Sequence, residues 1–359
     1  MSILASCYQT EYISKSLDGR EFVDSVYGFE EEYNTIRNNI GIMDYSDFGI
    51  IKVSGENVMD FIQLITTRDF EYFAPERART CLLLDNEAKI VSCTTVLNFE
   101  DYYYFLVYPG HISRTLEWLQ TNASEGILIE DLNGKISAIA IEGPMAWKVA
   151  EHFTPFEISS LSYMSFTQTT WQSTDIYISR IGYAGEYGYI FFSDVNIAPL
   201  LWKEIVKLGE PFSIKLCGLA VFEACMQEIR TPNISIEVPS GANLVESRLQ
   251  WLIDFTKSGY IGFDAVVKMV DEKSEKGIVG FFCDSSSGIV EGNDVYAADD
   301  KIGKVLSCFP CPSLSKNIGL AFIDSMFAQA GLELTANNTS ILTCSCPYVL
   351  PRSWSEKII

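Results

Sequence analysis

Apolar residues along this chain change repeatedly between helical and strand spacing, and this pattern constrains the fold more than any other feature. Residues three or four positions apart form one apolar helix face: Phe29, Tyr33, Ile36 and Ile40. The same spacing predicts helices over three further segments: 58–65, 112–119 and 197–208, the last ending at Gly209. Short apolar runs predict buried strands over 102–108, 136–141 and 176–178. Because strands and helices do not alternate regularly, we expect an α+β fold.

A charged segment, DEKSEK at 271–276, interrupts the apolar pattern and is typical of a linker between domains. Short segments rich in Val, Ile and Phe follow it, separated by Gly, Ser, Asn and Asp, which predicts a small all-β domain. We therefore expect an α+β region over 1–270 and an all-β domain over 277–359. No predicted strand is followed by a glycine-rich loop of the kind that binds nucleotides or phosphate.

The charge of the chain argues against several classes of partner. Its 47 acidic and 26 basic residues give a net charge of −21, which repels nucleic acids and anionic membrane surfaces. No uncharged apolar run reaches the roughly 18 residues expected of a membrane-spanning helix. The N-terminus lacks a basic leader followed by a long apolar core. Ten scattered cysteines are typical of reduced thiols in a cytoplasmic protein rather than of a disulfide framework.

Two cysteine pairs near the C-terminus raise the question of a metal site. Cys308 and Cys311 form a C-x-x-C motif, Cys344 and Cys346 form a C-x-C motif, and four such thiolates are able to bind zinc. Side chains two apart on a strand share one face, so packing explains the second pair without a metal. The two histidines do not have the spacing of a helical metal-binding pair. We therefore predict no metal site.

The segment SRIGYAGEYGY (179–189) resembles the strand–turn–strand signature of the glycine-cleavage T-protein family, the aminomethyltransferases. Further segments resemble the family in the same order along the chain: GIMDYSDFGIIKVSG (41–55), TRDF (67–70), RARTCLLLDNE (77–87), IEGPMA (141–146), SGYIGFDAV (258–266) and GKVLSCFPCPSLSKNIGLAFI (303–323). The resemblance covers roughly residues 25–355. The chain is identified as a divergent member of this superfamily.

The resemblance implies a three-lobed, clover-like fold with two α+β lobes, one of them ferredoxin-like, and a small C-terminal antiparallel β-barrel. It also implies a central hole that holds tetrahydrofolate and a role in transferring one-carbon units, such as aminomethyl or methyl groups. A non-enzymatic branch that assists iron–sulfur cluster assembly carries a lysine–glycine–cysteine motif. The equivalent segment, CMQEIRTP at 225–232, lacks that motif, which argues against this branch.

The resemblance also implies ligand contacts for particular residues. Glu186 occupies the position of a glutamate that hydrogen-bonds the pterin ring, whose N–H groups form a two-donor edge. The alternative for Glu186 is a solvated acid in a hairpin turn. Tyr183 is expected either to line the ligand site or to pack as an ordinary aromatic residue. Trp354, near a late family tyrosine, either supplies an aromatic wall or covers a core edge.

Several positions depart from the family pattern. Ser92 and Cys93 match an aspartate pair of which one member polarises the reacting folate nitrogen, and neutral groups do not stabilise a developing cation in the same way. Met226 matches an arginine that holds the folate tail, and a thioether provides no charge pairing. Asp47 stands where the family frequently has histidine, and His111 follows a buried strand near the expected ligand channel. We hypothesise that Asp47 or His111 acts as acid or base and Cys93 as nucleophile, while Ser92 and Cys93 alternatively only fill space.

Three functions are compatible with these departures. The favoured one is tetrahydrofolate-dependent transfer of a methyl or methylene group to or from a small-molecule substrate, distinct from standard glycine cleavage. The second is a non-catalytic folate-binding protein with an assembly or regulatory role, although no sequence feature indicates a protein partner. The third is an enzyme on the same scaffold that uses a ligand other than folate.

Overall fold

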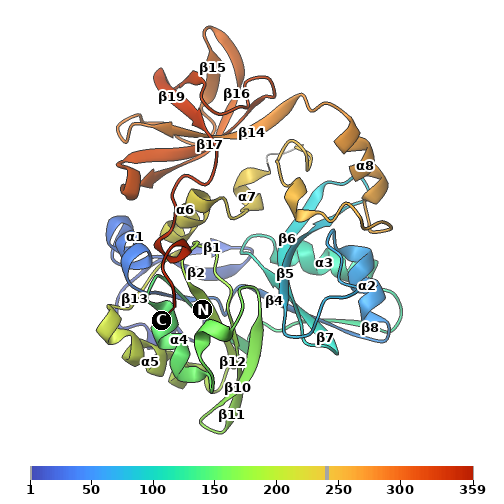
Figure 1. The fold of residues 1–359 in the computed structure, drawn as a ribbon, viewed down its shortest axis with the longest axis vertical. Coiled ribbons are helices and arrows are strands. Elements are labelled where there is room, and N and C mark those ends of the chain that lie inside the picture. Colours follow the sequence, from blue (N-terminus) through green and yellow to red (C-terminus); the bar gives the residue numbers. More distant parts are fainter. Residues whose placement is uncertain (1, 239–241, 359) are drawn as a thin grey trace.

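Three sheets, each at the centre of one lobe, organise the molecule (Figure 1). The computed structural model describes residues 2–238 and 242–358. Two lobes combine a sheet with helices, and the third is a closed barrel. This arrangement confirms the predicted three-lobed α+β fold. Within the described ranges, no helix is both long enough and apolar enough to cross a membrane.

The first lobe contains a six-stranded sheet that is buried on both faces. Its strands lie in the order β10 (Phe166–Trp171), β11 (Thr174–Ser179), β12 (Gly188–Asp194), β9 (Ile136–Glu142), β3 (Gly41–Asp44) and β13 (Lys215–Leu216). Along β12, Tyr189 and Phe191 pack beneath α4 (Ala146–Ala150) and α5 (Ala198–Gly209). Ile190 and Phe192 point to the opposite face, because successive side chains of a strand alternate.

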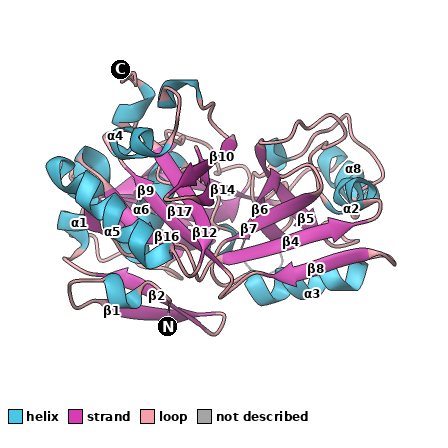
Figure 2. Cartoon of the chain, turned by 90° about the horizontal axis from the view of Figure 1, so that it is seen from below, coloured by secondary structure: helices cyan, strands magenta, loops and turns pink. Residues whose placement is uncertain are grey.

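The second lobe contains a five-stranded antiparallel sheet in the order β5 (Ala78–Leu84), β6 (Ile90–Asn98), β7 (Tyr102–Val107), β4 (Gly49–Gly55) and β8 (Ile127–Asp131). Helices α2 (Val58–Ile65) and α3 (Ile112–Asn122) pack in one core against it (Figure 2). Its other face shares a core with the six-stranded sheet, where Leu97 and Leu106 join Ile190 and Phe192. Helices α1 (Phe29–Asn38) and α6 (Leu219–Ile229) complete this shared core.

The third lobe is a closed antiparallel barrel, as predicted. Its strands follow the order β14 (Lys276–Cys283), β17 (Lys316–Asp324), β16 (Asp300–Cys311), β15 (Asp294–Ala297), β18 (Glu333–Ala336) and β19 (Thr339–Cys344). Helix α8 (Phe263–Asp271) ends where the charged segment 271–276 begins. After β19 the chain leaves the barrel and returns to the first lobe, where it forms a 3-10 turn at Arg352–Trp354 (Figure 1).

The remaining elements are short. An N-terminal hairpin, β1 (Ile13–Leu17) and β2 (Arg20–Ser25), lies beside α6, and α7 (Ile234–Glu237) lies between β6 and the barrel. The expected helices and buried strands are present with boundaries that differ by a few residues. The prediction that Gly209 caps α5 is wrong. Its φ of −84° is helical, and the chain continues directly into a 3-10 turn over Glu210–Phe212.

Candidate functional site

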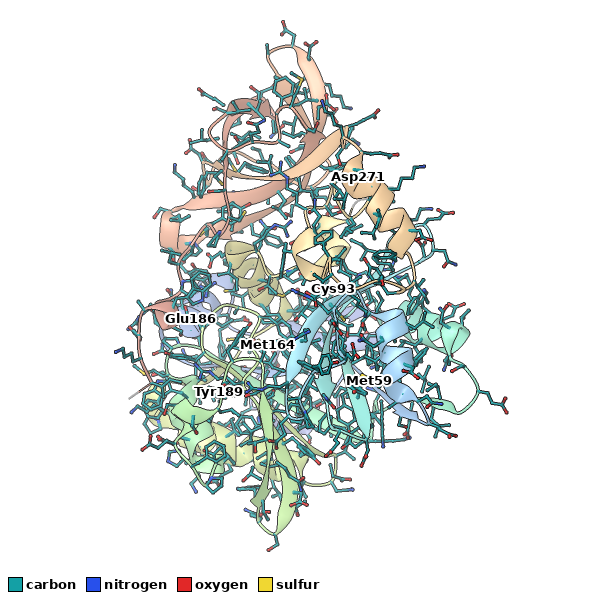
Figure 3. The ribbon with its side chains drawn as sticks, turned by 45° about the vertical axis from the view of Figure 1, so that its right-hand side comes forward. Met59, Cys93, Met164, Glu186, Tyr189 and Asp271 are labelled. Carbon is teal, nitrogen blue, oxygen red and sulfur yellow. The ribbon has the colours of Figure 1, made fainter. Side chains whose placement is uncertain are left out.

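A partly enclosed cavity of about 240 Å³ lies where the two α+β lobes meet. Its lining comes from the turn before β4, from β5–β7 and the residue after β7, from the segments before β10 and between β11 and β12, from helix α6 and the loop after it, and from a 3-10 turn at Gln250–Leu252. These residues are Phe48, Thr80, Cys93, Thr94, Thr95, Leu106, Val107, Tyr108, Tyr163, Met164, Ile181, Gly182, Tyr183, Met226, Ile229, Arg230, Thr231, Pro232 and Trp251. Figure 3 shows Cys93 and Met164 near the centre of the molecule. The cavity is thus built by segments that are far apart in sequence.

The five-stranded sheet supplies a neutral polar wall. Thr80 on β5 pairs with Thr95 on β6, and their Oγ1 atoms lie 3.0 Å apart. Cys93 lies two residues before Thr95 and also lines the cavity. Burial raises the pKa of the Cys93 thiol, so this side chain stays protonated near neutral pH. This wall therefore offers hydroxyl and thiol groups without a formal charge.

The turn between β11 and β12 supplies the opposite wall. The Tyr183 hydroxyl donates to Thr95 Oγ1 at 3.4 Å, which connects the two lobes across the cavity. Behind this turn lies Glu142, whose carboxylate accepts the backbone N–H of Tyr183 at 3.0 Å and that of Ala184 at 2.8 Å. Burial raises the pKa of Glu142 to about 7, although the two backbone donors oppose this shift.

Helix α6 and its C-terminal cap form a third wall. Met226 is buried and lines the cavity, and Arg230 lies one helical turn later. The Arg230 guanidinium forms an ion pair with Glu237 and donates to the Ser247 carbonyl at 3.3 Å. Among the described residues that line the cavity, Arg230 carries the one formal charge and none is a carboxylate.

Aromatic side chains complete the lining. Phe48 and Tyr108 are packed edge to face with ring centroids 5.6 Å apart. Tyr163 and Trp251 are 66% and 53% exposed, so they lie where the cavity opens to solvent. Aromatic and neutral hydrogen-bonding groups together suit a flat heteroaromatic ligand that carries both donors and acceptors.

Three of the residues singled out in the sequence meet in this cavity: Cys93, Tyr183 and Met226. Ser92 does not join them. It is fully buried, and its Oγ lies 2.9 Å from Thr115 Oγ1 on α3, on the side of the sheet away from the cavity. The alternation of side chains along β6 explains why Cys93 reaches the cavity while its neighbour does not.

Asp47 also lies outside the cavity. Its Oδ1 accepts from Asn133 Nδ2 at 3.1 Å, and it borders a separate hollow of about 20 Å³ with Tyr8 and Glu21. The neighbouring Phe48 is the residue of this turn that lines the cavity. The turn therefore directs the aromatic ring inward and the carboxylate outward, and the acid–base hypothesis for Asp47 has no geometric basis.

His111 lies at the start of α3, beside α7, and does not line the cavity. Its Nε2 contacts Ser235 Oγ, and its Nδ1 lies 2.9 Å from Arg114 Nη2. Because a guanidinium only donates, Nδ1 accepts and the ring proton of neutral His111 is on Nε2. Burial and the Arg114 charge lower the pKa of His111 to about 4. A histidine held in this tautomer is a structural donor to Ser235 and does not act as a base toward it.

Glu186 and Trp354 belong to the C-terminal segment instead of the cavity lining. The Glu186 carboxylate accepts from Ser353 Oγ at 2.6 Å, from the Ser353 backbone N–H at 3.0 Å and from Arg37 Nη1 at 3.3 Å. Figure 3 shows Glu186 beside the C-terminal ribbon. Trp354 is 56% exposed and does not line the cavity, where Trp251 supplies an aromatic side chain.

Sequence reasoning missed several cavity residues. Thr95 lies at a two-residue step from Cys93, and Arg230 lies a helical turn from Met226, so both spacings contained a usable signal. Glu142 stands in the IEGP turn and carried no separate signal of its position behind Tyr183. Trp251 lies in a 3-10 turn of three residues (Gln250–Leu252), which is too short for an apolar periodicity to predict the direction of its side chain.

The candidate zinc ligands have other neighbours in the structure. Cys308 Sγ lies 3.9 Å from Cys283 Sγ, and Cys311 Sγ donates to Glu228 Oε1 at 2.9 Å. Over residues 2–238 and 242–358, no cluster of three or more histidine, cysteine or acidic side chains is arranged to hold a metal ion.

Comparisons with known proteins agree with this architecture. Residues 9–257 match the family model described as GCVT N-terminal domain, and residues 276–340 match the glycine cleavage T-protein C-terminal barrel domain. The chain is 28% identical over 306 residues to an aminomethyltransferase of Thermoanaerobacter sp. (strain X514), covering 84% of this chain and 83% of that protein. It is 25% identical over 326 residues to an aminomethyltransferase of Bacillus subtilis (strain 168), covering 89% and 90%. The crystal structure of the glycine cleavage system aminomethyltransferase T from Bartonella henselae superposes with a TM-score of 0.88 at 18% identity, covering 98% of each chain.

Proposed function

Because the chain belongs to the glycine cleavage T-protein family, we propose that it is a tetrahydrofolate-dependent one-carbon transferase whose cavity holds the reduced folate. Its relationship to aminomethyltransferases along most of its length supports one-carbon transfer in general. The proposed reaction partner is a small molecule, because the cavity has a volume of only about 240 Å³ and its lining is largely apolar.

The cavity residues fit a pterin ring in chemistry. Thr80, Thr95 and Tyr183 provide hydroxyl groups that both donate and accept, and aromatic rings border them. The volume of about 240 Å³ is below the roughly 300–1,000 Å³ of sites for drug-sized ligands, so only part of a folate is enclosed. Trp251 and Tyr163, which are exposed at the opening, are placed to contact the part outside.

Bound folate supplies the nitrogen that carries or receives the one-carbon unit, and the chain supplies alignment and exclusion of water. The hydrogen bond from Tyr183 to Thr95 fixes the separation of two cavity walls. Buried apolar side chains, including Met226, limit the entry of water. Burial raises the pKa of Cys93, so its thiol stays protonated. Because a protonated thiol is a poor nucleophile, we assign Cys93 a neutral polar contact in place of the nucleophilic role.

The kind of one-carbon unit is inferred from the lack of a carboxylate among the described residues that line the cavity. Ser92 and Cys93 occupy the positions where the family resemblance leads us to expect aspartates, and neither is ionised. Without a carboxylate in contact with the ligand, stabilisation of a developing cationic nitrogen is weaker. We therefore propose methyl or methylene transfer with a small-molecule partner in place of standard aminomethyl transfer.

Calorimetric titration with tetrahydrofolate, 5-methyl-tetrahydrofolate and 5,10-methylene-tetrahydrofolate tests folate binding. The larger Cys93→Phe side chain fills the cavity and is expected to weaken binding by at least roughly tenfold, about 1.4 kcal/mol. The matched control Cys93→Ser keeps a small polar group and is expected to bind like the wild type. Absence of binding by the wild type to all three folates would contradict the proposal and leave another ligand for this scaffold.

Activity assays test whether the protein transfers a methyl or methylene group in place of an aminomethyl group. The wild type is expected to be inactive in an aminomethyl-transfer assay, and Cys93→Asp, which restores a carboxylate, is expected to gain measurable activity. Full aminomethyl transfer by the wild type would show standard glycine cleavage and overturn this part. Folate binding without transfer of any one-carbon unit would favour a non-catalytic folate-binding protein.

A further inference from the structure

One carboxylate lies directly behind the cavity without lining it. Glu142, at the end of β9, is fully buried. A Cβ atom added to Gly182, which lines the cavity, would lie 2.9 Å from Gly188 Cα and 3.1 Å from Glu142 Oε2, so the carboxylate packs directly against the backbone of a cavity residue. The absence of a side chain at position 182 thus leaves room for the carboxylate to lie against this part of the cavity wall.

The hydrogen bonds of Glu142 all point to the cavity wall or its support. Oε2 accepts from Tyr183 N at 3.1 Å and from Ala184 N at 2.8 Å, and Oε1 accepts from Tyr183 N at 3.0 Å and from the Tyr45 hydroxyl at 3.4 Å. No arginine or lysine forms an ion pair with it among the described residues. The positive charge of Arg37 acts on Glu142, but this guanidinium is bound to Glu228 and Glu186.

We propose that Glu142 is a positioning residue, which holds the turn at Tyr183 and Ala184 against the cavity and places negative charge behind Gly182. This inference rests on the proposed function, because it names the group that favours a ligand nitrogen on which positive charge develops. Glu142 acts through the wall rather than by touching the ligand, which distinguishes it from the aspartate expected at Ser92 or Cys93.

The protonation state of Glu142 determines how much negative charge lies behind Gly182. Burial raises its pKa to about 7, so the carboxylate is charged above neutral pH and protonated below it. The titratable groups that face it are Tyr45 from the turn before β4, Tyr183 and Tyr163 from the cavity, Cys225 from α6 and Arg37 from α1. Burial raises the pKa of Tyr45, Tyr183 and Cys225, and neighbouring protein atoms also raise the pKa of Tyr163 although its side chain is largely exposed. None of these groups ionises near neutral pH, and arginine stays charged.

Backbone amide resonances test the positioning role without any ligand. The ¹⁵N–¹H shifts of Tyr183 and Ala184 in the wild type are expected to titrate with a midpoint near the pKa of about 7 given for Glu142. Glu142→Gln retains an acceptor of the same shape and is expected to abolish this titration. Glu237→Gln, which changes another buried acid near the cavity, is the matched control and is expected to preserve it. A titration that persists in Glu142→Gln, or that is absent from the wild type, would overturn the proposal.

The affinity for 5-methyl-tetrahydrofolate tests the consequence for the ligand. Wild-type affinity is expected to fall roughly fivefold from pH 8 to pH 6 as Glu142 takes up a proton, and the Glu142→Gln affinity is expected to stay constant. Equal pH profiles in the two proteins would refute the ligand effect of Glu142. Failure of the wild type to bind any folate would instead refute the proposed function, while the amide titration decides the role of Glu142 separately.

Discussion

At the residue scale, one neighbour decides what the buried His111 is able to do. The Arg114 donor at Nδ1 selects the neutral tautomer that donates to Ser235. The folded protein holds the pKa of His111 at about 4, below the ordinary histidine value of 6.5. The unfolded chain therefore binds a proton between these pH values when the folded chain does not, and stability falls as the pH is lowered through this window.

Replacing His111 by glutamine is expected to remove this pH dependence. The wild type should lose about 3 kcal/mol of unfolding free energy between pH 6.5 and pH 4 through this residue, because one pKa unit corresponds to about 1.4 kcal/mol. Urea unfolding at several pH values measures the slope. His152→Gln, at an exposed position, is the control and should retain it. An unchanged slope in His111→Gln would contradict the assignment of the low pKa.

Glu186 provides a second prediction at this scale. Glu186→Ala removes the acceptor for Ser353 and leaves backbone N–H groups of the C-terminal segment unpaired. We expect a loss of about 3 kcal/mol in unfolding free energy and faster proteolysis after Leu350. Ser353→Ala should cost about 1 kcal/mol, because it removes one donor. Wild-type stability combined with lost folate binding in Glu186→Ala would instead restore the pterin contact that the family resemblance implies.

The side chains of the site were predictable where local periodicity determines direction. Cys93 and Met226 lie on a regular strand and a regular helix, and both reach the cavity. The position of Glu186 depends on Ser353, which is 167 residues away in sequence, and local pattern contains no information about such a partner. The family resemblance pointed to a turn that lies at the cavity, but it did not determine which side chain of this turn, Tyr183 or Glu186, lines the cavity.

At the scale of elements, the turn after β9 shows why a glycine was recognisable in the sequence. Gly143 has φ of +149°, and an added Cβ would lie 2.1 Å from the Asn39 carbonyl oxygen. A side chain at position 143 would push the backbone of Asn39 away, and because Asn39 follows α1 directly, this would displace α1 from the sheet. The requirement is therefore steric and local, and a short segment such as IEGP is enough to indicate it.

Alanine at Gly143 is expected to destabilise the fold by about 3 kcal/mol or more, through clash and backbone strain together. Gly134→Ala is the matched control, because φ is +73° and no atom of the described part of the chain lies within 4 Å of the added Cβ. Strain alone should cost that variant about 1–2 kcal/mol. Thermal unfolding of both proteins makes the comparison, and equal losses would show that contact with Asn39 does not matter.

The secondary structure followed closely from sequence because the elements are amphipathic. Helix α2 and strand β7 match the expected segments because their apolar spacing continues to their ends. The end of α5 was missed, since Gly209 keeps a helical φ while Pro211 and a 3-10 turn terminate the helix. The closure of the barrel was expected from the family resemblance, because alternating strands alone do not distinguish a barrel from a sandwich.

At the scale of the whole molecule, a buried polar cluster connects all parts of the chain that meet near α6. Arg37 Nη2 contacts Glu228 Oε2 at 2.6 Å, and Arg37 Nη1 contacts Glu186 at 3.3 Å. Cys311 of the barrel donates to Glu228, and Tyr33 links Glu228 to the barrel turn. The barrel, the C-terminal segment and the first lobe are thus held through one guanidinium and two carboxylates.

Arg37→Met is expected to weaken this connection between lobes more than it weakens any one core. Two carboxylates would remain buried without their cation, a situation that costs about 3–5 kcal/mol when one partner of a buried pair is removed. Because the barrel has its own apolar core, we expect unfolding to separate into two transitions in calorimetry. Arg180→Met is the matched control, since Arg180 donates to the Leu161 carbonyl at 2.8 Å, stacks on Tyr187 and has no carboxylate partner among the residues that the structure describes. A single cooperative transition in Arg37→Met, shifted no further than in Arg180→Met, would show that apolar packing alone couples the barrel to the rest of the molecule.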